Sequence, residues 1–294
     1  MNNILHTFTE YLNGDKKLSE NTLQSYKRDI EQYLNYVYKD LKQDIKETDN
    51  LSILKFINCQ RDIGKATSTI SRNIVSLKKF YKFIYDKKII EFNHAIFIES
   101  PKIEKKIPKI LTKDEVEKLL SQPKCDNNKG NRDKAMLQIM YSSGVRVSEL
   151  IELNIDNFNI DNGILKCLNR GRERFIKLDN EIKNILNEYI VKTRPNLIND
   201  KKEKALFVNL YGNRLTRQGF WKIMKKYKVG ADIKKDLTPH TLRHSIAAHM
   251  LQSGKDLEYI KDLLGHSDIS STQVYAKIID KDIKALYDKN NMKF

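Results

Sequence analysis

The chain has 294 residues, of which 40% are hydrophobic, enough to build the cores of two domains of ordinary size. Its 54 basic and 38 acidic residues give a formal net charge of +16, which favours a polyanionic partner such as nucleic acid, although a lysine-rich proteome gives the same excess. The three cysteines are scattered and form no C-x-x-C pair, which argues against a disulfide-rich protein. The first segment is unlike a signal peptide, and no apolar run reaches the length of about 20 residues that spans a membrane. The sequence therefore predicts a cytoplasmic protein.

Apolar residues at helical spacing dominate the first hundred residues. In "LSENTLQSYKRDIEQYLNYVYKDL", Ser19 is suited to be an N-cap, and a stripe of apolar residues follows it. A second stripe runs through "TSTISRNIVSLKKFYKFIYDKK". The two stripes comprise Leu23, Tyr26, Ile30, Leu34 and Val37, and Ile70, Ile74, Leu77, Tyr81 and Ile84. The pattern predicts a helical domain over residues 1–100.

The face opposite the second stripe is basic and carries Arg72, Lys78, Lys79 and Lys82. Such a face is either simply solvated or lies along the phosphates of a nucleic acid, and the sequence favours neither interpretation over the other. These four residues are therefore candidate DNA contacts.

A linker is predicted over residues 101–110. Pro101 and Pro108 disfavour helix, and the segment "ESPKIEKKIPKILTKDEV" is extended and basic in character. Its lysines, which are further candidate DNA contacts, are Lys102, Lys105, Lys106 and Lys109. Thr112 and Glu115 then form a T-x-x-E capping box, so a second domain is expected over residues 111–294.

The second domain is mostly helical in pattern, with one clear hairpin. "GILKCLNRGRERFIKL" places two apolar runs around a turn at residues 169–172, where Gly171 can adopt a positive φ. The segment "ALFVNL" is strand-like. The predicted fold class is therefore mainly α with a small β-sheet.

Three short segments of this domain carry candidate site residues. "YSSGVRVSELIEL" contains Arg146 and Glu149, which on their own suggest an i,i+3 ion pair on a surface helix. "LTPHTLRHSIAAHMLQSG" opens with an N-cap and a proline, and places His240 and Arg243 on one face at a helix N-terminus, which favours anions. "LLGHSDISSTQVY" contains His266 and Tyr275, which singly suggest a core histidine and a residue of an amphipathic helix.

A metal site is not expected. His244 and His249 have the wrong spacing for one helical face, and no cysteine or carboxylate cluster stands near them. The same lack of a carboxylate cluster argues against a metal-dependent nuclease.

Together, in this order and in a basic two-domain chain, these segments resemble the tyrosine recombinase (phage integrase) family, most closely its small bacterial Xer-type members. "SGVRVSEL" is similar to the first arginine box, "PHTLRHSIAAHML" to the H-x-x-R box, and "LLGHSDISSTQVY" to the final His-to-Tyr box. "RLTRQGFW" and "LSENTLQSYKRDI" also resemble Xer-type segments. The resemblance covers nearly the whole chain.

The resemblance implies a helical, SAM-like core-binding domain and a mixed α/β catalytic domain that close around DNA as a C-shaped clamp, without an additional arm-binding domain. It implies double-stranded DNA with a short inverted-repeat site as substrate, and a homo- or hetero-tetramer on paired sites. A second recombinase or a DNA translocase is a further candidate partner, and no cofactor is implied. A short end helix containing Ile283, Leu286 and Tyr287 is expected to dock into a neighbouring protomer.

The resemblance also implies a role for each site residue. Arg146 and Arg243 would hold the phosphate oxygens, and Tyr275 would be the nucleophile that forms a 3′-phosphotyrosyl link. His240 would be the base, His266 would donate a hydrogen bond to the phosphate, and Glu149 would orient its neighbours.

One position departs from the family pattern. Where Xer-type proteins have a lysine in the hairpin turn, this chain reads "NRGRER", one residue short. Alignment from Arg146 places Arg170 at the lysine position, whereas alignment from "ER" places Asn169 there, and Lys166 and Arg172 are fallbacks.

Chromosome dimer resolution is the favoured role, and a mobile-element integrase or a catalytically impaired, architectural DNA-binding protein is the alternative.

Overall fold

The computed structural model describes residues 2–14, 18–102, 108–169, 171–265, 268–276 and 278 of the chain. These residues form two compact units, Met1–Lys105 and Lys106–Phe294. Each unit has a hydrophobic core of its own.

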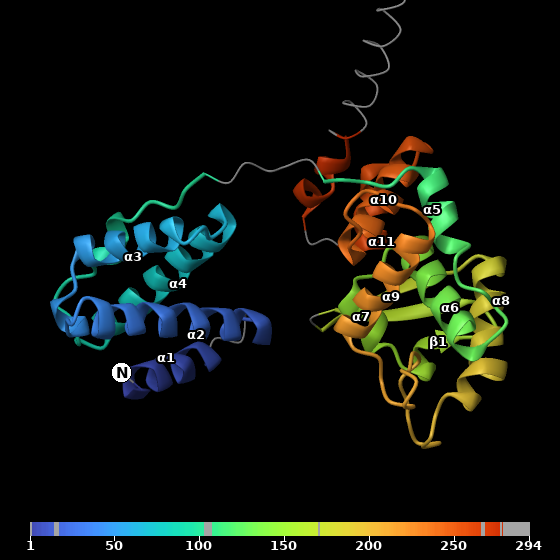
Figure 1. The fold of residues 1–294 in the computed structure, drawn as a ribbon, viewed down its shortest axis with the longest axis horizontal. Coiled ribbons are helices and arrows are strands. Elements are labelled where there is room, and N and C mark those ends of the chain that lie inside the picture. The colour runs from blue at the N-terminus through green and yellow to red at the C-terminus, as the bar shows by residue number, and fades with distance from the viewer. Residues whose placement is uncertain are drawn as a thin grey trace, which may run out of the picture. The chain divides into compact units, whose positions relative to one another are not determined.

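Unit 1 is built from helices (Figure 1). Its α-helices are α1 (Asn2–Asn13), α2 (Glu20–Asn35), α3 (Asn50–Asp62) and α4 (Thr67–Asp86). A π-helical turn over Tyr36–Asp40 extends α2, and short 3-10 turns cover Ile45–Glu47 and His94–Phe97.

The predicted apolar stripes build the core of unit 1. The Ser19 side chain accepts a hydrogen bond from the Thr22 N–H and thereby caps α2, as expected from the sequence. All five stripe residues of α4 are buried, whereas Leu23 and Tyr26 of the first stripe are only partly buried. The apolar stripe of each helix therefore marks the side on which α2 and α4 pack into the core.

The basic face of α4 is not uniformly available to a ligand. Arg72 Nη1 donates a hydrogen bond to the buried carboxylate of Asp29 on α2, so this guanidinium joins two helices. Lys82 is exposed and lies 3.3 Å from the carboxylate of Asp86. Lys78 is half-buried.

Unit 2 combines helices with one three-stranded antiparallel sheet in the order β1-β2-β3. Its α-helices are α5 (Lys113–Leu120), α6 (Asn128–Ser143), α7 (Val147–Glu152), α8 (Asn180–Glu188), α9 (Arg217–Gly230), α10 (Pro239–Gln252) and α11 (Leu257–Leu264). Its strands are β1 (Phe158–Asn159), β2 (Ile164–Asn169) and β3 (Arg172–Lys177). Short 3-10 or π-helical turns cover Ile155–Asn157, Tyr189–Thr193, Arg194–Asn196 and Ile269–Ser271. The predicted class, mainly α with a small sheet, is confirmed.

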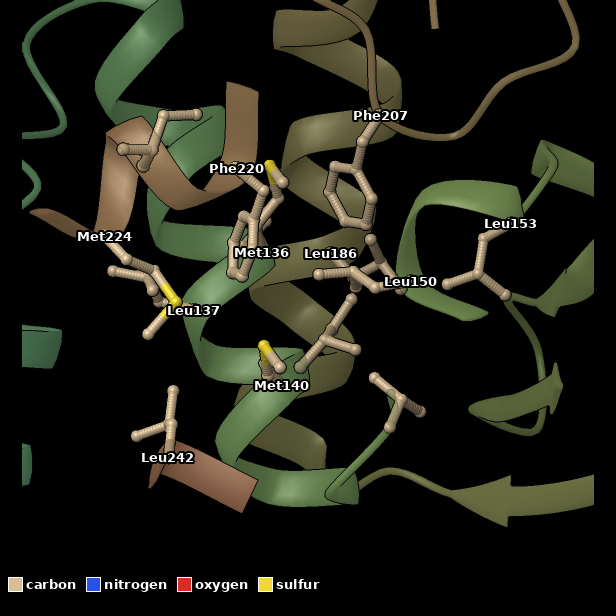
Figure 2. Close-up of a cluster of buried hydrophobic side chains, with 14 of the residues drawn as sticks. Met136, Leu137, Met140, Leu150, Leu153, Leu186, Phe207, Phe220, Met224 and Leu242 are labelled. Carbon is tan, nitrogen blue, oxygen red and sulfur yellow. The ribbon is translucent and has the colours of Figure 1, made fainter. Parts of the chain in front are cut away.

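Helix α6 is the centre of the core of unit 2 (Figure 2). Its Met136 and Met140 are fully buried among the side chains of Leu186, Phe207 and Phe220, which come from other segments of the unit. Because α6 is packed on most of its surface, its C-terminal end is held firmly, and the first of the candidate site segments begins there.

The hairpin and the capping box lie where the sequence places them, whereas the strand-like segment does not form a strand. Thr112 and Glu115 form the expected capping box at the start of α5. The segment 205–210 is buried at its start but makes only two isolated bridges, Ala205 with Asn154 and Val208 with Arg214. The apolar residues of this segment indicate burial and not a strand. A ladder does not form because the chain turns back at residues 209–213.

Within the described residues, no helix combines the length and the apolar character that crossing a bilayer requires.

Candidate active site

The first site segment starts at a sharp turn between α6 and α7. Gly144 caps α6 with a φ of +57°, a left-handed conformation that glycine adopts without strain. A Cβ at this position would lie 2.5 Å from Leu264 Cδ2, so a larger residue would also clash with α11. The turn lets α7 begin immediately after Arg146, and it leaves the Gly144 carbonyl at the end of α6 facing the site.

Glu149 is the buried counter-charge of this region. Its two carboxylate oxygens accept hydrogen bonds of 2.8 Å each from the Nη1 and Nη2 of Arg174 on β3. They also accept bonds from the Arg146 N–H at 2.7 Å and from Arg146 Nη1 at 3.1 Å. Burial alone would raise the pKa of Glu149, but the hydrogen bonds and charge of Arg174, followed by those of Arg146, hold it below its usual value.

Glu149→Gln should therefore be strongly destabilising. The change leaves two guanidiniums beside a side chain that no longer carries a negative charge and is only 2% exposed, and breaking such a pair costs roughly 3–5 kcal/mol. The free energy of unfolding, measured in urea at pH 7, checks this. Glu173→Gln is the matched control, because Glu173 is 46% exposed and pairs with Lys166 at the surface, where a pair is worth about 0–1 kcal/mol. Equal effects of the two changes would contradict the prediction.

The second site segment is the first half of α10. Thr238 caps the helix through the Thr241 N–H, and Pro239 occupies its first position, as the sequence predicts. His240 lies exposed at this end. Partial desolvation, and then the charges of Arg243 and Arg146, lower the pKa of His240, so its ring is neutral at pH 7.

Arg243 is buried and held by backbone carbonyls. Its Nη1 donates to the carbonyl oxygen of Gly144, and its Nη2 donates to that of Leu264 at 2.5 Å. Burial, with Arg146 close by, lowers the pKa of this guanidinium to about 9, which leaves it cationic at neutral pH. The side chain joins the ends of two helices, α6 and α11.

The end of α11 also binds Arg146. Arg146 Nη2 donates to the carbonyl oxygen of Gly265 at 3.1 Å, and Nη1 lies 3.4 Å from that of Leu264. Gly265 caps α11 with a φ of +62°, and a Cβ there would lie 2.5 Å from Arg174 Nη1. The two capping glycines therefore allow helix ends and arginines to approach closely, and the partial negative charge of each helix end offsets the guanidinium charges.

Tyr275 is buried against α10 and α11. Only 1% of its surface is exposed, and its ring belongs to a small apolar cluster with Ala247, Ile260, Leu264 and Ile278. Its hydroxyl is hydrogen-bonded to Nδ1 of His244 at 2.8 Å. Burial raises the pKa of Tyr275, and the positive charges of Arg243 and Arg146 only partly offset that rise. The structure thus brings Arg146, Arg243 and Tyr275 into one electrostatic environment.

The two later histidines of α10 each make hydrogen bonds to neighbouring groups. His244 contacts Tyr275, a contact that sequence reasoning missed, although its i,i+4 spacing from His240 places both rings along one side of the helix. His249 lies 2.9 Å from the Tyr141 hydroxyl through Nδ1 and 3.0 Å from the Leu111 carbonyl oxygen through Nε2. Among the described residues, no group of three or more metal-ligating side chains occurs.

The hairpin places its basic residues on two faces. Cys167 pairs with Arg174 across the strands, and Lys166 pairs with Phe175, so Lys166 lies on the face opposite Arg174. Lys166 Nζ lies 2.7 Å from the Glu173 carboxylate there. Arg172 shares the face of Arg174 by the alternation of the strand.

Several predicted residues lie outside the described part of the chain. They are Arg170, His266, Lys105 and Lys106, together with the end segment that contains Ile283, Leu286 and Tyr287. Of the other linker lysines, Lys102 is exposed, and the exposed Lys109 lies 3.5 Å from the Asp236 carboxylate.

Two family models match the chain. The model of the phage integrase family matches residues 109–281, and the model of the phage integrase N-terminal SAM-like domain matches residues 5–88. One match lies within each compact unit.

The chain is also similar to curated proteins and to solved structures. A tyrosine recombinase XerD from Oceanobacillus iheyensis is 43% identical over 289 residues, which cover 96% of each chain. A XerH site-specific recombinase bound to palindromic difH substrate superposes with a TM-score of 0.76 at 20% identity, over 90% of this chain and 78% of that one. A lambda integrase tetramer bound to a Holliday junction gives a TM-score of 0.73 at 16% identity, over 93% and 76%. The two structural similarities show a shared fold.

Proposed function

The chain belongs to the phage integrase family and is a site-specific DNA recombinase, and from this premise we propose that Tyr275 is its nucleophile and chromosome dimer resolution its role. The similarity to a XerD recombinase along almost the entire length of both chains supports the chromosomal role over integration of a mobile element. The observation that carries the chemistry is that Tyr275 packs with Leu264, whose carbonyl oxygen accepts hydrogen bonds from both Arg243 and Arg146.

The proposed reaction exchanges one phosphate ester for another. The Tyr275 oxygen attacks the phosphorus, the bond from phosphorus to the 5′-oxygen breaks, and a 3′-phosphotyrosyl link remains. Arg146 and Arg243 stabilise the negative charge that builds on the non-bridging oxygens, and His266 donates a further hydrogen bond there. The link conserves the energy of the phosphodiester, so the 5′-hydroxyl of a second strand can reverse the step without ATP.

Protons move at both ends of this exchange. We assign His240 as the base for the phenolic proton, because its ring is neutral at pH 7 and lies on the same helix as Arg243. Arg170 is proposed to stabilise the leaving 5′-oxygen while that oxygen takes a proton from water, and Arg172, on the face of Arg174, is the fallback. Glu149 orients Arg146 through the hydrogen bonds described above.

The partners follow from the proposed reaction. Double-stranded DNA with a short inverted-repeat site is the substrate, and four protomers act on paired sites. The lambda integrase tetramer on a Holliday junction, which shares the fold, supports this assembly. A second recombinase or a DNA translocase is a further candidate partner.

A covalent protein–DNA adduct is the direct test. The full chain is incubated in EDTA with fragmented chromosomal DNA of its own organism, denatured in SDS and captured on a filter that retains protein. Retained DNA whose sequences share one short inverted repeat is the expected result, and it also identifies the site for nicked substrates. If DNA is bound before denaturation and none is retained after it, the chain is an architectural DNA-binding protein and the proposal fails.

DNA binding should depend steeply on salt. With six or more phosphates neutralised, counterion release lowers the affinity on the order of 10³-fold between 50 and 200 mM salt. Titrations of labelled site DNA by fluorescence anisotropy measure the slope. Lys82→Gln should lower the slope by about one, because Lys82 is on the basic face of α4. Lys192→Gln is the matched control, since Lys192 is an equally exposed lysine with an i,i+4 acidic partner. A flat salt response would remove the electrostatic basis of the clamp.

A further inference from the structure

His244 has a contact with the reacting atom but no role in the mechanism above. Its Nδ1 lies 2.8 Å from the Tyr275 hydroxyl, and it follows Arg243 directly on α10. The rings of His244 and His240 lie 6.3 Å apart on one side of the helix. Within the described residues, this is the hydrogen bond that the structure shows for the Tyr275 hydroxyl.

The direction of the hydrogen bond follows from the protonation of both groups. Burial, and then the charges of His240 and Arg243, lower the pKa of His244 to about 4, so its ring is neutral at pH 7. The pKa of Tyr275 is raised, so the phenol keeps its proton. Because His244 is the hydrogen-bond partner that the described residues offer to the phenolic proton, we assign the Tyr275 hydroxyl as donor and Nδ1 of His244 as acceptor, with the ring proton on Nε2.

The same pKa values indicate whether His244 only accepts a hydrogen bond from the Tyr275 hydroxyl or also removes its proton. Because the pKa of Tyr275 is raised by burial and that of His244 is lowered to about 4, complete transfer of the proton from the phenol to the imidazole is strongly disfavoured. In this arrangement His244 holds the hydroxyl and leaves its proton in place. Because only 1% of the surface of Tyr275 is exposed, bulk water has little access to replace such a partner.

We propose that His244 is a positioning residue whose Nδ1 fixes the Tyr275 hydroxyl beside Arg243 and Arg146 before the phosphate is attacked. The inference rests on the proposed role of Tyr275 as nucleophile. Loss of the acceptor would leave a buried hydroxyl without a partner and favour other orientations of the side chain, and misplaced reacting groups slow a reaction substantially.

Two substitutions separate the acceptor from the rest of the ring. His244→Asn places an amide oxygen close to the position of Nδ1, whereas His244→Leu has similar bulk and no acceptor. The first-order rate of adduct formation on a nicked site should fall about 10- to 100-fold in His244→Leu, and return to within a few-fold of the wild type in His244→Asn. Half-site affinity should stay unchanged in both variants.

The control lies on the same helix. His249→Leu also removes a buried, hydrogen-bonded histidine of α10, but one that contacts Tyr141 and the Leu111 carbonyl. Its adduct rate, corrected for the folded fraction, should match that of the wild type. A wild-type rate in His244→Leu would overturn the proposal. An Asn variant as slow as the Leu variant, with imidazole in the buffer restoring the rate, would instead make His244 the proton acceptor.

A measurement without DNA tests the contact independently of the proposed function. In the full chain with isotope-labelled histidine rings, Tyr275→Phe removes the donor that stabilises neutral His244. The NMR titration of His244 should shift to higher pH, whereas that of His249 should not move. An unchanged His244 titration would overturn the inference even if the wild type cleaves DNA. If the His244 titration shifts but the wild type forms no covalent adduct with DNA, the proposed function is wrong, whereas the contact between His244 and Tyr275 is supported.

Discussion

Tyr275→Phe is expected to abolish the covalent adduct while leaving DNA binding intact. The substitution removes the one oxygen that can attack phosphorus, and the buried ring that remains still fills the apolar cluster of α10 and α11. Binding is carried by many phosphate contacts, to which one buried hydroxyl adds little. Adduct on a nicked site is measured by denaturing gel, and affinity by gel shift.

Tyr259→Phe is the control for this change. Tyr259 is the tyrosine of α11, 48% exposed, and its hydroxyl makes no hydrogen bond that the structure shows within the described residues. Its loss should leave adduct formation at the wild-type rate. Adduct formed by Tyr275→Phe would mean that another tyrosine attacks, and Tyr259→Phe and Tyr287→Phe would then be examined in that background.

The second large effect is expected from Arg243→Lys. Lysine keeps the positive charge but loses the planar fork that reaches the two carbonyls at the ends of α6 and α11. A donor to the charged transition state is typically worth about 10²–10³ in rate, so the adduct should form more slowly by that factor. The rate on a saturating amount of nicked DNA measures the chemical step apart from binding.

Arg194→Lys controls for the loss of a buried guanidinium. Arg194 is also buried, and it donates to the carbonyl oxygens of Ala205 and Glu203 without contacting the site. Both lysine variants should lose stability, but only Arg243→Lys should lose rate once the folded fraction is taken into account. Equal rates in the two variants would contradict a role for Arg243 in the reaction.

Local signals in the sequence predicted local structure well. Ser19, Thr112 and Thr238 cap the helices that the sequence assigns to them, and Gly171 takes the positive φ of the hairpin turn. Each of these features depends on residues within a few positions of one another. The family boxes predict that Arg146, Arg243 and Tyr275 share one catalytic site, which stays a prediction, and the structure shows that all three contact Leu264.

Contacts specific to this fold could not be predicted in the same way. His244 and Tyr275 are 31 positions apart, and no pattern in either segment indicates that the two side chains meet. The partnership of Arg72 with Asp29 spans 43 positions and turns an apparent surface cation into a link between helices. The carbonyl partners of Arg243 could not be predicted either, because every residue has a backbone carbonyl and the sequence does not show which of them accepts a hydrogen bond.

The carbonyl oxygens that hold Arg146 and Arg243 also determine which anions can compete for these side chains. These carbonyl oxygens occupy part of the five N–H donors of each guanidinium, so a free phosphate ion can use only the remaining donors, and each such hydrogen bond brings little net free energy in water. A phosphate within a DNA strand arrives tethered, because the remaining contacts of the duplex present it at a high effective concentration. The arginine pair is therefore expected to bind phosphate that is attached to a long, bound chain in preference to small free anions.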